Sequence, residues 1–103
     1  MFGRARPHKG ELSLSGHGQL RDDAWELARF WINGERSYVM TALNKSWSPE
    51  LVGSLLLESA RTVAAAYAHT GAMSEAEAWT RILHGLDEER SRLTAAGDQD
   101  DQA

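Results

Sequence analysis

The chain has 103 residues, no cysteine and a formal net charge of −4. This length accommodates one small domain, and the absence of cysteine excludes disulfide bonds and thiolate metal sites. The acidic balance argues against a general nucleic-acid-binding protein, which needs a basic face. A domain this small buries only about 60% of the surface that its unfolded chain exposes, so we expect association to contribute to its stability.

The two ends of the chain differ in charge. Basic residues gather in residues 1–10, whereas aspartates gather in the last six residues. Both ends are poor in apolar residues, so we expect a disordered basic tail over 1–10 and a disordered acidic tail over 96–103. A single α+β domain then occupies residues 11–95. A basic arm that contacts RNA or anionic lipid is the alternative for the first ten residues.

The sequence also predicts the cellular location of the protein. The first residues lack the apolar stretch of a secretory signal. Residues 51–68 are rich in Leu and Ala, but Glu58 and Arg61 near the middle are not typical of a membrane span. We therefore expect a cytoplasmic protein that binds neither membrane nor nucleic acid.

The first predicted strand covers residues 24–32. Its apolar side chains alternate, with Trp25 and Trp31 on one face and Phe30 and Ile32 on the other. This β-branched and aromatic content favours a strand. Because both faces carry large apolar groups, we expect the strand to be covered, wholly or partly, on both sides.

A turn and a return strand complete a predicted hairpin. Asn33-Gly34-Glu35-Arg36 favours a tight turn in which Gly34 takes a positive φ. Residues 37–43 then form the return strand. Further upstream, Leu12 and Leu14 alternate, which allows a short extra N-terminal strand over residues 11–15.

The first helix begins with a clear signal. Ser48 is the predicted N-cap, Pro49 takes the first helical position, and Glu50 lies at the positive end of the helix dipole. We expect this helix to run to about His69 and to end before Gly71.

The second helix begins at a capping box. Ser74 is followed three residues later by Glu77. We expect this helix to run to about Ala95, with Gly97 as its end. The predicted fold is therefore α+β, a β-hairpin followed by two helices (ββαα), with both helices packed on one face of the hairpin.

The two helices differ in the width of their apolar surface. The second has one stripe of roughly 120°, as expected of a surface helix. The first has a predicted core face formed by Val52, Leu55, Leu56, Val63, Ala66 and Tyr67. A second set widens its apolar arc to roughly 220° and consists of Leu57, Ala60, Ala64 and Ala68. We expect this outer arc, with Arg61, to form a homodimer interface together with the hairpin.

The sequence predicts no catalytic residue, no metal site and no cofactor. The histidines lack metal-ligand spacing, and no nucleotide-binding or hydrolase motif occurs. Arg29, with Trp25 and Trp31 nearby in the strand, is a candidate for holding an anionic ligand. The alternative is an edge arginine that lies across aromatic rings with its head in water. Arg61 is expected to pair with Glu58 or to set the register of the interface.

The sequence also resembles a small family of uncharacterised alphaproteobacterial proteins, classed as a domain of unknown function. The similarity covers roughly residues 24–90. It is carried by Ala28-Arg29-x-Trp31, Trp47, Pro49, Gly53, Glu58, Ala60-Arg61, Ala66-Tyr67, Glu77-Ala78, Ile82, Gly85, Asp87 and Glu89. The chain departs from the family pattern at position 62, because the family has His after the Arg and this chain has Thr62. It is also one residue shorter between Trp47 and Pro49. The resemblance implies a shared fold and supplies no activity.

These features favour a non-enzymatic homodimeric interaction or regulatory module. The alternative is a module that binds a small anionic ligand through Trp25, Arg29 and Trp31. The sequence names neither a ligand nor a partner protein.

Overall fold

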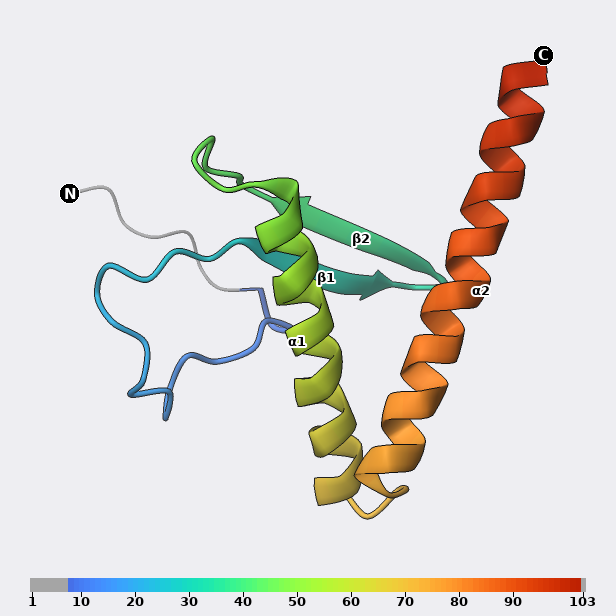
Figure 1. Cartoon of the computed structure of the whole chain (residues 1–103). Coiled ribbons are helices and arrows are strands. Elements are labelled where there is room, and N and C mark those ends of the chain that lie inside the picture. The colour runs from blue at the N-terminus through green and yellow to red at the C-terminus, as the bar shows by residue number, and fades with distance from the viewer. Residues whose placement is uncertain (1–7, 103) are drawn as a thin grey trace. The chain divides into compact units, whose positions relative to one another are not determined.

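The computed structural model describes residues 8–102, with side chains described for residues 8–97. The elements are β1 (Ala28–Asn33), β2 (Arg36–Thr41), α1 (Pro49–His69) and α2 (Glu75–Gln102) (Figure 1). The fold is therefore α+β with the predicted order ββαα. The chain divides into two compact units, a hairpin unit that ends at Leu43 and a helical unit that begins at Asn44.

The hairpin is closed by the predicted turn. β1 and β2 are antiparallel, and the innermost pair is Asn33 opposite Arg36. Gly34 has a φ of 69°, and no described residue other than glycine has a positive φ. A two-residue loop with a positive φ at its first position is a type II′ turn, whose twist suits an antiparallel hairpin. Both strands are shorter than predicted, although a hydrogen bond from Ala42 N to Leu27 O (3.2 Å) continues the pairing beyond them.

The two faces of the hairpin are not equally covered. Trp31 is half-buried and has His8 against it, with ring centroids 5.1 Å apart in an edge-to-face arrangement. On the opposite face Phe30, Ile32 and Val39 are 62%, 89% and 54% exposed. The prediction that the first strand is covered on both faces is therefore wrong for Phe30 and Ile32, which together with Val39 form the open face of the hairpin.

The extra N-terminal strand is absent. Among the described residues the sheet contains β1 and β2 alone. Ser15 N donates to Ser13 Oγ (3.0 Å), and His17 N donates to Leu14 O (3.2 Å). Local bonds of this kind give the backbone an alternative to strand pairing. The alternation of Leu12 and Leu14 therefore does not make a strand. The predicted tail over 1–10 lies mostly outside the described residues.

Local signals set both ends of α1. At its start, Ser48 has an extended backbone and its Oγ accepts a hydrogen bond from Leu51 N (3.1 Å), as expected of an N-cap. At its end, Gly71 has a φ of 79°, and its N–H donates to Ala68 O (3.1 Å). The N–H of Ala72 donates to Tyr67 O (3.2 Å). These two bonds form a Schellman motif, which satisfies carbonyls at the helix end.

The start of α2 is confirmed, whereas its end is not. Ser74 Oγ accepts a hydrogen bond from Glu77 N (3.1 Å). The helix then continues through Gly97 to Gln102, so the predicted end at Gly97 is wrong and most of the predicted tail 96–103 lies within α2. Gly97 does not have a positive φ. A glycine with helical backbone lowers helix stability by about 1 kcal/mol but does not end the helix.

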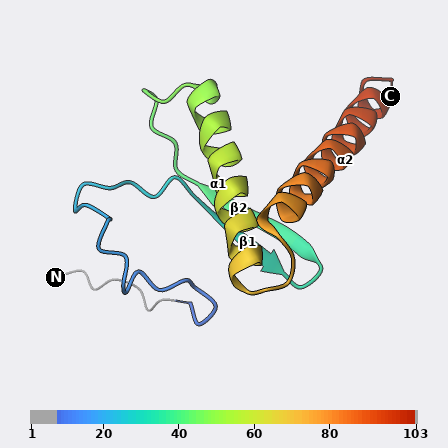
Figure 2. The same cartoon turned by 60° about the horizontal axis from the view of Figure 1, so that its bottom comes forward.

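Small side chains fill the buried part of the helical unit. α1 and α2 meet near the loop that joins them and diverge toward their other ends (Figures 1 and 2). Ala60, Ala64 and Ala78 are 8%, 0% and 1% exposed, and no other described residue is buried. No helix in the described part of the chain is both long enough and apolar enough to cross a membrane.

The larger apolar residues of α1 are not part of this core. Leu55, Leu56, Val63 and Tyr67 are each between 42% and 49% exposed. The predicted core face of α1 is therefore open in the structure, and the predicted outer arc contains the buried alanines. Alanine and leucine count equally in an apolar arc, but only alanine lets two helix backbones approach closely.

Candidate functional site

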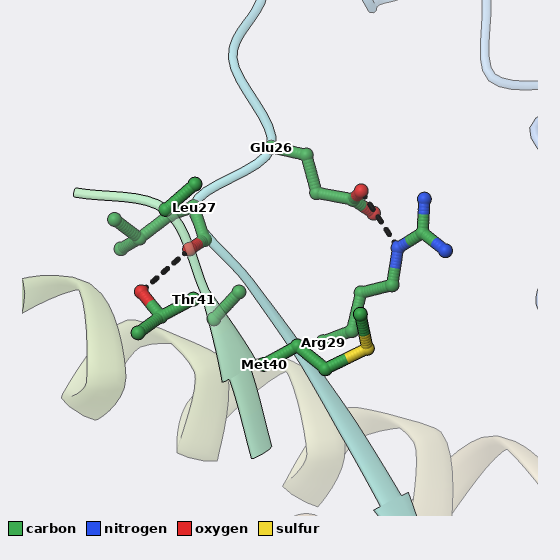
Figure 3. Close-up of a pocket in the computed structure, with 7 residues that line it drawn as sticks. Glu26, Leu27, Arg29, Met40 and Thr41 are labelled. Atoms are coloured by element: carbon green, nitrogen blue, oxygen red, sulfur yellow. Dashed lines mark hydrogen bonds and ion pairs between the residues drawn. The ribbon is translucent and has the colours of Figure 1, made fainter. Parts of the chain in front are cut away.

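A shallow hollow in the hairpin unit is the candidate ligand site. It has a volume of about 240 Å³ and lies where β1 begins and β2 ends. It is lined by Glu26, Leu27, Ala28, Arg29, Met40, Thr41 and Ala42 (Figure 3). Thr41 Oγ1 donates to Leu27 O (2.9 Å) and holds the two chain segments together at this point.

Arg29 supplies the charged group of the hollow. Its Nε donates to Glu26 Oε1 (2.7 Å), as Figure 3 shows, and its Nη1 lies 3.8 Å from Glu11 Oε2. The hydrogen bond to Glu26 and the attraction of both carboxylates raise the pKa of Arg29 above its usual value. The guanidinium charge is thus already compensated by two carboxylates, and an incoming anion has to compete with them.

The tryptophans predicted to flank Arg29 do not line the hollow. Trp25 Nε1 donates to the backbone carbonyl of Ala42 (3.1 Å), which fixes the ring against the return strand. Trp31 contacts His8, and its buried Nε1 has no hydrogen-bond partner among the described residues. Of the three predicted ligand-binding residues, only Arg29 therefore lies at the hollow.

Sequence reasoning missed Glu11 and Glu26, which pair with Arg29. Glu26 lies three residues before Arg29, a separation that could have suggested the pair. Glu11 lies eighteen positions away and carries no local signal. The binding of an anionic ligand at Arg29 stays a prediction.

The residues predicted for the homodimer interface differ in their burial. Ala60 and Ala64 are buried within the chain, whereas Leu57 and Ala68 are exposed. The guanidinium of Arg61 lies over the ring of Trp79 in α2, 5.7 Å from its centroid. This is a cation–π distance, and among the described residues no ion pair joins Arg61 to Glu58. Arg61 therefore links the two helices of one chain.

The remaining titratable groups do not gather into a site. Among the described residues, no three His, Asp or Glu side chains are close enough together to hold a metal ion. His84 Nε2 lies 3.3 Å from Glu88 Oε1, one turn along α2, and both side chains are largely exposed. We regard this contact as a surface pair.

The comparison with protein families identifies the group to which the chain is related. The family described as "Domain of unknown function (DUF5076)" matches residues 16–94. The chain belongs to this family. The resemblance seen in the sequence, to a domain of unknown function, is thereby confirmed, while the alphaproteobacterial origin stays a prediction.

Comparisons with individual proteins add a similar solved structure. None of the curated proteins matches this member of the family. The chain is similar to a solved structure described as "Structure of a putative pyruvate dehydrogenase from the photosynthetic bacterium Rhodopseudomonas palustrus CGA009". The two chains are 27% identical, with a TM-score of 0.63, and the similarity covers 85% of this chain and 89% of the other.

Proposed function

We propose that this chain is a non-enzymatic, homodimeric interaction or regulatory module of the cytoplasm. The observation that carries the proposal is the exposure of its large apolar side chains, while the buried described residues are three alanines. Monomeric soluble proteins rarely expose contiguous apolar patches larger than a few hundred Å². Apolar surface of this kind is typical of a protein that associates.

The open face of the hairpin supports this proposal. Phe30 and Ile32 of β1 lie beside Val39 of β2, because the register places Phe30 opposite Val39. An isolated two-stranded hairpin is at best marginally stable in water, and further strands or a helix are needed to stabilise it. A second copy supplies the further strands that the hairpin lacks.

The exposed side of α1 supports the proposal independently. At about 100° per residue, Leu56, Val63 and Tyr67 fall within roughly 40° of one another around the helix. All three are between 42% and 49% exposed. We call them the α1 stripe. Helices in proteins gain most of their stability from packing such a stripe, which favours its burial against a partner.

A dimer of identical chains is the simplest assembly that both extends the hairpin and covers the α1 stripe. Two-fold dimers are the commonest oligomers, and in a two-fold interface each surface meets its own copy. The α1 stripe carries no charge, so its approach to the same stripe of a second copy opposes no like charges. The same absence of charge holds for the open face of the hairpin.

The name of the similar structure suggests the rival function, an enzyme that acts on pyruvate. Arg29 is the residue that bears on it, because a guanidinium is an ordinary partner for a substrate carboxylate. Here the guanidinium already pairs with Glu11 and Glu26, so a small anion has to compete with carboxylates that belong to the chain. A ligand that binds the native state raises the melting temperature further as its concentration increases, and a titration with pyruvate tests this rival directly.

The proposal is tested by light scattering on two matched variants. Leu56→Glu places a charge in the α1 stripe and is expected to shift the protein from dimer to monomer. Ser54→Glu adds the same charge on the opposite side of α1 and is expected to leave the dimer intact. Equal behaviour of the two variants, or a wild-type monomer at tens of micromolar, would contradict the proposal.

A further inference from the structure

The register of the hairpin fixes which backbone groups of β2 point away from β1. The two-residue turn makes Asn33 and Arg36 a hydrogen-bonded pair, and such pairs recur at every second residue. The hydrogen bond from Ala42 N to Leu27 O belongs to the same series. The N–H and C=O groups of Ser37, Val39 and Thr41 therefore lie along the outer edge of β2.

This edge lacks the features that normally protect an unpaired strand. Among the described residues no third strand pairs with it, and every residue of β2 is exposed. Residues 37–43 contain no charged residue, no proline and no glycine, and they include Tyr38 and Val39. Proteins cover or charge such an edge, because it otherwise pairs with any available strand. The charged residue of β2, Arg36, lies at its turn end, outside the run 37–43, and the charged residue of β1, Arg29, lies near the start of that strand.

We propose that β2 pairs with β2 of a second copy, antiparallel, about a two-fold axis at Val39. This register places Val39 opposite Val39 of the partner subunit. It places Ser37 opposite Thr41 of the partner subunit. It places Tyr38 opposite Met40 of the partner subunit. Hydroxyl pairs and pairs of an aromatic with an apolar side chain stabilise neighbouring strands.

The same register avoids electrostatic conflict. Arg36 lies just outside the paired run of residues 37–41, so no two like charges face each other. The result is a four-stranded sheet in the order β1, β2, β2, β1. Its two open faces, each formed by Phe30, Ile32 and Val39, merge into one apolar surface. This inference rests on the proposed homodimer and specifies the edge and the register that it uses.

The natural chain has no cysteine, so single cysteines report the pairing without interference. Residues that face each other in a hydrogen-bonded antiparallel pair have Cα atoms about 5.5 Å apart. This lies within the range of about 4.4–6.8 Å that a disulfide spans. Val39→Cys is therefore expected to form a disulfide-linked dimer on mild oxidation. Ile32→Cys is the matched control. Ile32 lies on the same face as Val39 and is more exposed, but it belongs to β1, the outer strand of the proposed sheet, and has no partner copy opposite it.

A second pair of variants tests the edge without oxidation. Val39→Lys places a charge in the middle of the outer edge of β2 and is expected to abolish the dimer in light scattering. Ile32→Lys places the same charge on the same face in β1 and is expected to retain the dimer. A wild-type monomer would contradict the proposed function itself. A wild-type dimer in which Val39→Cys does not cross-link, or cross-links no more than Ile32→Cys, would overturn the β2 pairing and leave the homodimer standing.

Discussion

The hairpin unit and the helical unit use their apolar residues in different ways. In the hairpin unit His8 lies against Trp31 and leaves the opposite face open. In the helical unit the buried residues are alanines, and the larger side chains of α1 stay exposed. In each unit a few residues pack against one another, and the larger apolar side chains stay exposed. The apolar residues outside each local core are therefore exposed, and the proposed homodimer uses them.

The largest effect is expected where the helical unit is most tightly packed. Ala64→Leu adds three carbons at a fully buried position, and overpacking of this kind lowers the free energy of unfolding by about 1–3 kcal/mol. Ala65→Leu makes the same change at the exposed neighbouring position and should have little effect. Urea denaturation followed by circular dichroism measures both. Equal destabilisation by the two variants would mean that the alanine contact does not hold the helices together.

The hairpin unit should respond most to a change in its turn. Gly34→Ala forces a residue with a Cβ into a positive φ, which costs about 1–2 kcal/mol. Gly53→Ala lies within α1 with open space around it and should stabilise the chain by about 0.5–1 kcal/mol. The two variants should therefore shift the urea midpoint in opposite directions. A shift in the same direction would contradict the turn or the helix.

The N-cap residues of α1 and α2 should contribute equally to stability. Ser48→Ala and Ser74→Ala each remove a side-chain oxygen that accepts a backbone N–H, and each should cost about 1 kcal/mol. The fold should remain the same, so the circular dichroism spectrum at low urea should not change. Unchanged midpoints in both variants would show that the helices begin elsewhere.

The smallest effect is expected at Arg29. Its ion pairs with Glu11 and Glu26 lie near the surface, where such pairs contribute little to stability. Arg29→Ala should therefore fold normally and melt close to the natural protein, as thermal denaturation would show. Loss of soluble protein in this variant would identify Arg29 as a structural residue and remove the case for a ligand site.

The sequence predicted the local features of the fold. The positive φ of Gly34, the end of α1 before Gly71 and the caps at Ser48 and Ser74 are confirmed, because each depends on a few neighbouring residues. The end of α2 was placed wrongly, because a glycine ends a helix only when it adopts a positive φ. Gly97 and Gly71 look alike in the sequence, and only the backbone distinguishes them.

The candidate sites were harder to predict, because they depend on residues that are distant in the sequence. Arg29 was identified as notable, but its partner Glu11 carries no signal near it. The periodicity of α1 indicates a wide apolar arc, but the side with Ala60 and Ala64, which is assigned to a partner chain in the prediction, is buried within the chain. Periodicity shows which residues are apolar and does not show which neighbour covers them.

The oligomeric state in solution tests the central claim most directly. Light scattering on the natural protein at tens of micromolar gives its mass, for comparison with the 11.4 kDa of one chain. We predict twice the chain mass, because a second copy pairs with the hairpin and covers the α1 stripe. A mass equal to one chain under these conditions would contradict the account.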